Sequence, residues 1–199
     1  MKKLFILVLA LMCAGVMCGQ ENSAKDRVTV NGVTWATCNV DAPGTFADSP
    51  ESTGMFYQWN RTIGWSATDN ITDWNRSSPV GSIWEKVNSP CPQGWRVPTI
   101  EELNTLLNTK KVEQEWTTQN GVNGRKFTDK VSGSFLFLPA AGYRDYSDGA
   151  LLGVGNNGYY WSSVKVSEVR ARSLDFGNAD ASMGSGNRIY GFSVRCVAE

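Results

Sequence analysis

The stretch CPQGWRVPTIEEL, residues 91–103, decides the fold because a cysteine, a tight turn and a helix start follow one another without a break. Thr99 followed three residues later by Glu102 forms a capping box, in which each side chain accepts a hydrogen bond from the other residue's backbone N–H. Pro98 stands just ahead of this cap. We therefore expect a helix that begins at Thr99, a few residues after Cys91.

The residues after this cap carry a helical pattern. Apolar side chains three and four positions apart share one face, namely Ile100, Leu103, Leu106 and Leu107. Lys110 and Lys111 follow, where positive charge suits the negative end of the helix dipole. The pattern predicts one amphipathic helix that ends at these two lysines.

The rest of the chain is expected to form short strands and loops. VTVNGVTW (28–35) is a hairpin pattern, because Asn31 and Gly32 both tolerate the positive φ of a type I′ turn. NGVNG (120–124) supplies turns. Further strands are predicted in SFLFLPAAGY (134–143), GYYWSSV (158–164), RARSLDF (170–176) and GFSVRCV (191–197). The order of hairpin, aromatic-anchored loops, helix and strands indicates an α+β fold.

The N-terminal run MKKLFILVLALMCAGVMC has two lysines and then an apolar stretch typical of a secretory signal, too short for a membrane span. We expect a signal peptide over residues 1–19 and a single domain over residues 20–199, exported to the cell surface or secreted. Cys18 is a candidate lipidation site, which would make the protein an outer-membrane lipoprotein, although Met17 before it is bulkier than the usual small residue. That lipid would be the expected membrane attachment.

Composition narrows the function. The chain has no histidine, which removes the commonest general base and metal ligand and excludes catalytic triads built on histidine. Removing Lys2 and Lys3 with the signal leaves 17 basic against 19 acidic side chains, so the domain is weakly acidic. That balance argues against a nucleic-acid partner. We expect no cofactor, no metal and no catalytic activity.

Three cysteines follow the signal, namely Cys38, Cys91 and Cys196. An exported chain occupies a compartment where disulfides persist, and an odd count leaves one thiol unpaired unless Cys18 or a second chain takes part. The residues alone allow three pairings. Strand alternation places Cys38 with Ala36, opposite Trp35, so we expect Cys38 to be a small buried hydrophobe.

Six motifs in order, over nearly the whole mature chain, carry a resemblance. They are WATCNVDAPGTFA (35–47), CPQGWRVPTIEEL (91–103), WTTQNGVNG (116–124), FLPAAGYRD (137–145), GYYWSS (158–163) and GFSVRCV (191–197). The chain resembles the exported Fibrobacter succinogenes major paralogous domain family. That family is similar to the C-type-lectin-like fold in the form seen in formylglycine-generating enzymes.

The resemblance has consequences for structure and activity. It implies that Cys91 pairs with Cys196, which ties the helix start to the last strand. The further pair of closely spaced cysteines used by formylglycine-generating enzymes does not occur here. The acidic triplets with which C-type lectins bind calcium and sugar do not occur either. We therefore carry over the fold and neither activity.

The segment RARSLDFGNADASMGSGNRIYGF, residues 170–192, has the composition of a binding surface, because Tyr and Arg supply contact area while Ser, Gly and Asn adapt their hydrogen bonds. It resembles the variable segment of ligand-binding proteins diversified by retroelements, and it lacks the Lys, Gln, Glu and Trp that such diversification cannot produce. The predicted ligand-binding residues are Arg170, Arg172, Asp175, Asp180, Ser182, Ser185, Asn187, Ile189 and Tyr190.

The expected function is therefore an adhesin or receptor-binding module with a protein or glycan ligand at the cell surface. A polar surface strand and loop without a ligand is the plainer interpretation of the same segment. Two alternatives stay open, a structural or tip subunit of a surface assembly such as a pilus, and an enzyme of unrecognised type that uses Asp145 and Asp148. Their stretch YRDYSDG (143–149) is more typical of a solvated turn than of a calcium site.

Overall fold

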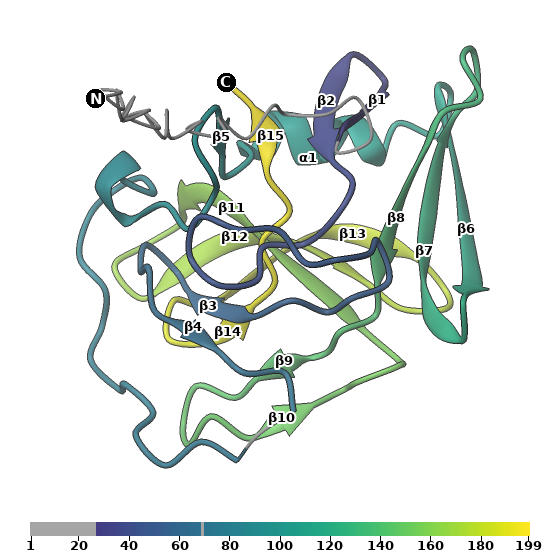
Figure 1. Ribbon diagram of the computed structural model, residues 1–199. Coiled ribbons are helices and arrows are strands. Elements are labelled where there is room, and N and C mark those ends of the chain that lie inside the picture. The colour runs from purple at the N-terminus through teal and green to yellow at the C-terminus, as the bar shows by residue number, and fades with distance from the viewer. Residues whose placement is uncertain (1–26, 69) are drawn as a thin grey trace, which may run out of the picture.

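The computed structural model describes residues 27–68 and 70–199, and the predicted signal peptide and Cys18 lie outside this range. The described chain is mostly β-structure with one short α-helix and a 3₁₀ turn at Lys86–Asn88 (Figure 1). No helix within these residues is long and apolar enough to cross a bilayer. The α+β expectation is therefore confirmed in its coarse form, several antiparallel sheets around a single α-helix.

Fifteen strands form four antiparallel sheets within the described residues. The sheet orders are β1-β2-β15-β5, β10-β9-β14-β3-β4, β11-β12-β13 and β6-β7-β8. The first half of the strands is β1 (Arg27–Val30), β2 (Val33–Ala36), β3 (Phe56–Gln58), β4 (Gly64–Trp65), β5 (Trp95–Arg96), β6 (Val112–Gln119) and β7 (Val122–Asp129). The second half is β8 (Phe135–Pro139), β9 (Tyr143–Arg144), β10 (Leu151–Leu152), β11 (Gly158–Lys165), β12 (Arg170–Phe176), β13 (Ala181–Asn187), β14 (Gly191–Phe192) and β15 (Val197–Ala198).

The predicted N-terminal hairpin is confirmed. β1 pairs with β2 in a register that joins Val30 to Val33 across a two-residue turn. Asn31 and Gly32 take φ values of 46° and 82°, the left-handed conformations that a type I′ turn requires. The local sequence therefore fixes both the turn and the pairing that follows from it.

The helix α1 (Ile100–Leu106) begins as predicted and ends earlier than predicted. Thr99 Oγ1 accepts the Glu102 N–H at 3.3 Å, and Glu102 Oε2 accepts the Thr99 N–H at 2.8 Å, which completes the capping box. The expectation that Lys110 and Lys111 end the helix is wrong. Asn and Thr favour turns over helix interiors, and at 108 and 109 they lead the chain straight into β6.

The pairing of Cys91 with Cys196 is confirmed, with the two Cα atoms 6.1 Å apart. Cys196 lies directly before β15, which pairs on one side with β2 and on the other with β5. The bond therefore joins the segment that precedes α1 to the end of the chain, and Figure 1 shows β5, α1 and β15 gathered at the same end of the molecule.

Cys38 is a free thiol, and it is half-buried rather than fully buried as the alternation predicted. β2 ends at Ala36, so the alternation of an extended strand does not continue to Cys38. The Cys38 sulfur lies 3.7 Å from Thr37 Oγ1. The prediction that Cys38 is buried is therefore wrong, although its small side chain forms no disulfide among the described residues.

Three long strands escape the sequence patterns. β6 and β7 pair over their whole lengths around a tight turn at Asn120 and Gly121, where the sequence had indicated turns alone. The glycine-rich β13 pairs along its whole length with β12. Polar and glycine-rich strands are stabilised by their neighbours more than by their own propensity, which is why their composition did not reveal them.

The core has two parts. One packs α1 against the hairpin strands and the long sheets, and its largest fully buried members are Trp35, Tyr160, Phe127, Leu103 and Leu106. The other is rich in aromatic rings and lies around the C-terminal strands, with Tyr57, Trp59, Trp161 and Phe192 among its buried members. The second part forms the base of the site described next.

Candidate ligand-binding site

The C-terminal segment singled out by composition is a β-hairpin. β12 and β13 are paired from Arg170 opposite Asn187 to Phe176 opposite Ala181, and β13 is the outer strand of its sheet. The sheet is completed by β11. The hairpin therefore has two ends that carry polar side chains. One is the turn near residues 177–180, and the other is the open end near Arg170 and Asn187.

A cavity of about 420 Å³ opens at the second end. Four tyrosines, a phenylalanine and a few polar groups line it, and we call it the tyrosine cup. Its lining residues are Tyr143, Tyr146, Tyr159, Arg170, Asp175, Ser185, Gly186, Asn187, Tyr190 and Phe192. They come from β9 and the turn after it, from β11, β12 and β13, and from the start of β14.

The rings of the cup hold one another in place. Tyr143 meets Tyr159, Tyr190 and Phe192 edge-on, with ring centroids 5.1, 5.4 and 6.2 Å apart. Tyr190 stacks on Phe192 at 5.4 Å and is met edge-on by Tyr146 at 5.1 Å. Each such pair adds about 0.5 to 1.5 kcal/mol beyond burial. The aromatic wall is therefore formed before any ligand arrives.

Two glycines of β13 make room for the floor. A Cβ at Gly186 would stand 2.7 Å from a ring atom of Phe192 and 3.2 Å from one of Trp161. A Cβ at Gly184 would stand 1.8 Å from the Oδ2 atom of Asp175. The glycines that looked like signs of a loop are positions where neighbouring side chains approach the backbone.

Asp175 brings a carboxylate to the cup. Its Oδ1 atom is buried and has no hydrogen-bond partner among the described residues. Burial raises the pKa of Asp175 above its ordinary value, while the Ser173 hydroxyl and the positive charge of Arg170 act against this shift. A buried acceptor without a donor destabilises a fold by about 1 to 3 kcal/mol, so this carboxylate is a feature that packing alone does not explain.

Arg170 lies at the rim of the cup, and β13 holds its guanidinium. Arg170 Nε donates to Ser185 Oγ at 3.1 Å, and Nη2 donates to the Ser185 carbonyl oxygen. None of the ion pairs among residues 27–68 and 70–199 includes Asp175. The positive and negative groups of the cup are therefore separate rather than paired.

The structure brings together five of the nine predicted site residues, which are Arg170, Asp175, Ser185, Asn187 and Tyr190. The other four do not line the cup. Arg172 is half-buried on β12, and Asp180 and Ser182 are exposed at the turn end of the hairpin. Ile189 is only 9% exposed, and its backbone oxygen accepts a hydrogen bond from Gln58 Nε2.

The sequence interpretation missed five lining residues, Gly186 and the four aromatic residues Tyr143, Tyr146, Tyr159 and Phe192. The four aromatic residues lie in motifs that were interpreted as strands and a solvated turn. The aromatic density of GYRDY (142–146) and GYY (158–160) was the available signal. This signal did not show which residues the rings would meet, because only the folded chain places them beside residues 170–190.

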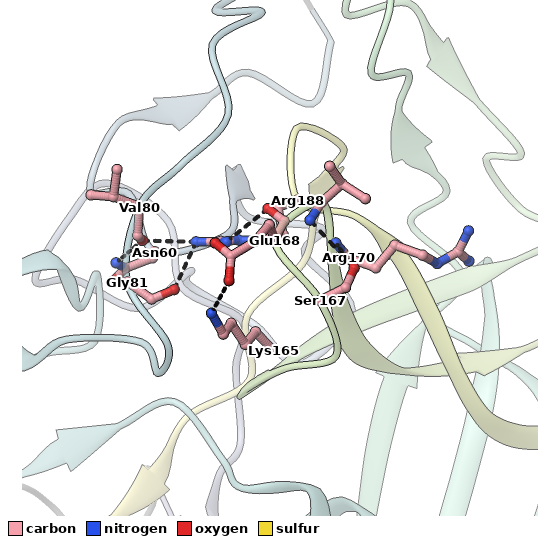
Figure 2. A network of polar contacts seen from close by, with 9 residues as sticks. Asn60, Val80, Gly81, Lys165, Ser167, Glu168, Arg170 and Arg188 are labelled. Atoms are coloured by element: carbon pink, nitrogen blue, oxygen red, sulfur yellow. Dashed lines mark hydrogen bonds and ion pairs between the residues drawn. The ribbon is translucent and has the colours of Figure 1, made fainter.

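A buried arginine holds the end of β13 beside the cup. Arg188 Nη1 donates to the Glu168 carbonyl oxygen at 3.0 Å, and Nη2 donates to the carbonyl oxygens of Val80 and Gly81 at 2.7 and 3.2 Å. The guanidinium also lies over the Trp59 ring, 4.3 Å from its centroid. Figure 2 shows Arg188 between the two loops that it joins.

The charge state of Arg188 reflects this burial, because desolvation lowers its pKa while the Glu168 carboxylate acts in the opposite direction. Glu168 itself pairs with Lys165 on the outside of the network (Figure 2). Asn60 Nδ2 adds a 2.8 Å bond to the Val80 carbonyl oxygen. Arg188 is thus a positioning residue for the segment that carries Asn187 and Tyr190.

The acidic stretch YRDYSDG forms a turn between β9 and β10. Asp145 Oδ1 accepts bonds from the Ser147 N–H and hydroxyl at 2.9 and 2.6 Å, and Asp148 Oδ1 accepts the Ala150 N–H at 2.9 Å. Among the residues that the structure describes, no group of three or more Cys, Asp or Glu side chains is arranged to hold a metal ion. The carboxylates of this stretch shape the turn that presents Tyr146.

Residues 20–198 match the Fibrobacter succinogenes major domain, so the chain belongs to that family and the resemblance of its six motifs is confirmed. No curated protein and no solved structure is found to match the chain.

Proposed function

We propose that this protein is an exported, non-catalytic ligand-binding module, an adhesin or receptor-binding domain that holds a protein or glycan ligand in the tyrosine cup. The observation that carries the proposal is the convergence of one hairpin with rings from three other elements. Five residues chosen on composition line the same cavity as Tyr143, Tyr146, Tyr159 and Phe192. Rigid aromatic area beside adaptable polar groups is the usual chemistry of a binding surface.

Export is supported by two features. The Cys91–Cys196 bond suits an oxidising compartment, because cytosolic thiols are kept reduced. The first 18 residues of the sequence have the charge and apolar pattern of a secretory signal. Attachment through a lipid at Cys18 is part of the proposal and would place the cup at the cell surface.

The finer fold assignment also belongs to the proposal. We place the domain with C-type-lectin-like folds of the formylglycine-generating-enzyme type. The disulfide between the segment before α1 and the last strand supports this placement, as does the helix start RVPT at residues 96–99. In such a fold the C-terminal hairpin is the element that varies, and retroelement-driven variation of residues 170–190 remains a prediction for sequencing of this gene across a population.

The test uses ligands selected without prior assumption. A phage-displayed peptide library and a glycan array are probed with the folded chain, and each binder is measured on variants of the cup. Tyr146→Ala removes a ring that is 45% exposed, and Tyr190→Ala removes the ring that it meets. We expect each change to weaken binding by about tenfold or more, as truncation of an aromatic anchor does.

The matched control is Val131→Ser. Val131 is 95% exposed in the turn between β7 and β8 and does not line the cup. We expect it to leave both binding and melting temperature unchanged. Binders whose affinity survives both tyrosine substitutions, or libraries that give no binder, would count against the cup as the binding site.

A further inference from the structure

We propose that the tyrosine cup takes a cationic group on an apolar stem, the chemistry of a lysine or arginine side chain of a protein ligand, with Asp175 as its counter-charge. This inference rests on the proposed function, since it names the ligand of the same site. Three observations carry it, namely the unpartnered carboxylate, the aromatic walls and the sign of the charges around them.

The first observation is that Asp175 is placed to accept a charge from outside. Its Oδ1 atom is buried without a donor, and no arginine or lysine of the described residues forms an ion pair with it. β13 accommodates the carboxylate with a glycine at position 184, where any side chain would collide with Oδ2. A half-buried carboxylate with one oxygen left unsatisfied invites an explanation in function, and a ligand cation supplies the missing partner.

The second observation is the nature of the walls. Tyr143 meets Tyr159 and Tyr190 at steep angles, while Tyr159 and Tyr190 both stack on Phe192, so the wall combines ring faces and ring edges. The faces of aromatic rings attract cations, and the attraction grows when water is excluded. The same rings pack well against the methylene stem of lysine or arginine. One group therefore satisfies the walls and the carboxylate together.

The third observation is the sign of the local charge. Burial raises the pKa of Tyr159 and of Tyr190, and the carboxylates of Asp175 and Asp145 raise them further. Arg170 is the positive group at the rim, and its guanidinium donates two hydrogen bonds to Ser185, which hold it against β13. Asp175 within the cup and Asp145 in the neighbouring turn thus make the local charge negative, against one restrained cation.

A neutral sugar is the main competitor, because sugars also stack on aromatic rings. It would leave the charge of Asp175 without compensation. Asn187, the amide side chain at the rim, already uses its Oδ1 atom to accept the Ile189 N–H at 3.1 Å. To a sugar the cup offers hydroxyl, amide and carboxylate hydrogen-bond partners, but only a cation also neutralises the charge of Asp175 and is attracted to the ring faces.

The test compares three small probes on the folded chain with isotope-labelled tyrosine rings, followed by NMR. They are N-acetyl-lysine amide, the uncharged N-acetyl-norleucine amide with the same stem, and a panel of neutral methyl glycosides. We expect the lysine probe to shift the rings of Tyr143, Tyr159 and Tyr190 saturably. We expect norleucine to bind about tenfold more weakly or worse, because it lacks the charge.

The variant Asp175→Asn keeps the shape of the side chain and removes its charge. It should reduce lysine-probe binding to the level of the norleucine probe, because the counter-charge is lost. The melting temperature should not fall, because the folded protein no longer has to desolvate a carboxylate. The matched control is Asp145→Asn, in which the amide oxygen still accepts the Ser147 bonds of its turn. That change should reduce lysine-probe binding far less than Asp175→Asn does.

Each outcome decides the inference. Equal binding of the lysine and norleucine probes, equal effects of the two aspartate substitutions, or binding of glycosides alone would overturn it and leave the cup as a site for another ligand class. No response of the cup rings to the lysine probe would also overturn it. The library screen with Tyr146→Ala then shows separately whether the cup binds anything, so the two proposals can fail independently.

Discussion

The carboxylate of Asp175 on β12 lies against the backbone of Gly184 on β13, so closely that a Cβ at position 184 would stand 1.8 Å from Oδ2. We predict that Gly184→Ala displaces this carboxylate and weakens ligand binding by about tenfold, the cost of a displaced binding group. The fold should tolerate the change, because the Asp175 side chain can rotate and alanine is favoured over glycine in a strand. A binding titration checks the expected loss of affinity, and thermal melting of the same preparation checks that the fold is retained.

Gly186→Ala is the companion to that variant on the same strand. Its added methyl would meet ring atoms of Phe192 and Trp161, both of which are buried and cannot rotate away. We expect the free energy of unfolding to fall by about 1 to 3 kcal/mol, as overpacking of a core usually does. If Gly184→Ala proved as destabilising as Gly186→Ala, the carboxylate would be a packing element rather than a movable binding group.

The lowered pKa of Glu102 leads us to predict that the fold loses stability at acid pH. Burial raises its pKa, but hydrogen bonds from Arg96 and from the Thr99 N–H, with the charge of Arg96, lower it below the ordinary value of 4.5 overall. A carboxylate with a depressed pKa contributes stability that is complete above the unfolded value and is lost as pH falls through the folded value. Stability should therefore begin to decline as pH falls below about 4.5.

The variant Glu102→Gln separates this residue from the other acids. It should remove about 1 kcal/mol at pH 7, the usual contribution of a helix cap, and should flatten the decline below pH 4.5. Denaturant titrations of both proteins from pH 3 to pH 7 measure the effect, where the range is chosen as roughly spanning carboxylate titration. A decline of the same depth in Glu102→Gln would assign the acid sensitivity to other carboxylates.

The disulfide gives a prediction with a free cysteine as its control. Cys91 and Cys196 are separated by 105 positions, and a bond that closes a loop of about 100 residues is worth up to about 4 to 5 kcal/mol in chain-entropy models. Replacing both by alanine should lower the free energy of unfolding by about 2 to 5 kcal/mol. Cys38→Ala should change it little, because Cys38 is half-buried and forms no disulfide. Comparable losses in both variants would contradict the structural role of the bond.

The features that could be predicted are those whose cause is local. The turn at Asn31 and Gly32 and the cap at Thr99 each depend on residues within a few positions of one another, and both are confirmed. The pairing of Cys91 with Cys196 was reached through a family resemblance, since the residues alone left three choices. Composition found half of the cup because one hairpin supplies five of its residues.

The features that escaped are those made by distant pairing. Tyr143 and Tyr159 reach the cup because Arg144 pairs with Gly191 and Tyr160 bridges to Ser193, contacts across tens of residues that no local pattern encodes. β13 is a strand because β12 stabilises it, although its glycines resemble those of a loop. The carboxylate that we consider decisive, Asp175, was chosen for its type, but its lack of a partner is visible only in the fold.

Arg188 provides the last prediction, because its guanidinium is the donor for the carbonyl oxygens of Glu168 and Gly81 and for one of the two bonds to Val80. Arg188→Met keeps the stem over Trp59 and removes the donor to the Glu168 and Gly81 carbonyl oxygens, while Asn60 still donates to Val80. We expect the free energy of unfolding to fall by about 2 to 4 kcal/mol. Arg188→Lys should rescue only part of this loss, because an ammonium group lacks the planar fork that reaches several carbonyls at once.

The control for this position is Arg172→Met, which removes a half-buried arginine of β12 outside the network and should change stability by about 0.5 kcal/mol or less. Hydrogen exchange then distinguishes a local role from a general one. In Arg188→Met the amides of Arg188 and Tyr190, bonded to Val169 and Asn187, should exchange faster than those of the hairpin at β1 and β2. Because Tyr190 is a wall of the cup, ligand affinity should fall with that local opening, and an unchanged affinity would mean that the cup is held by its rings alone.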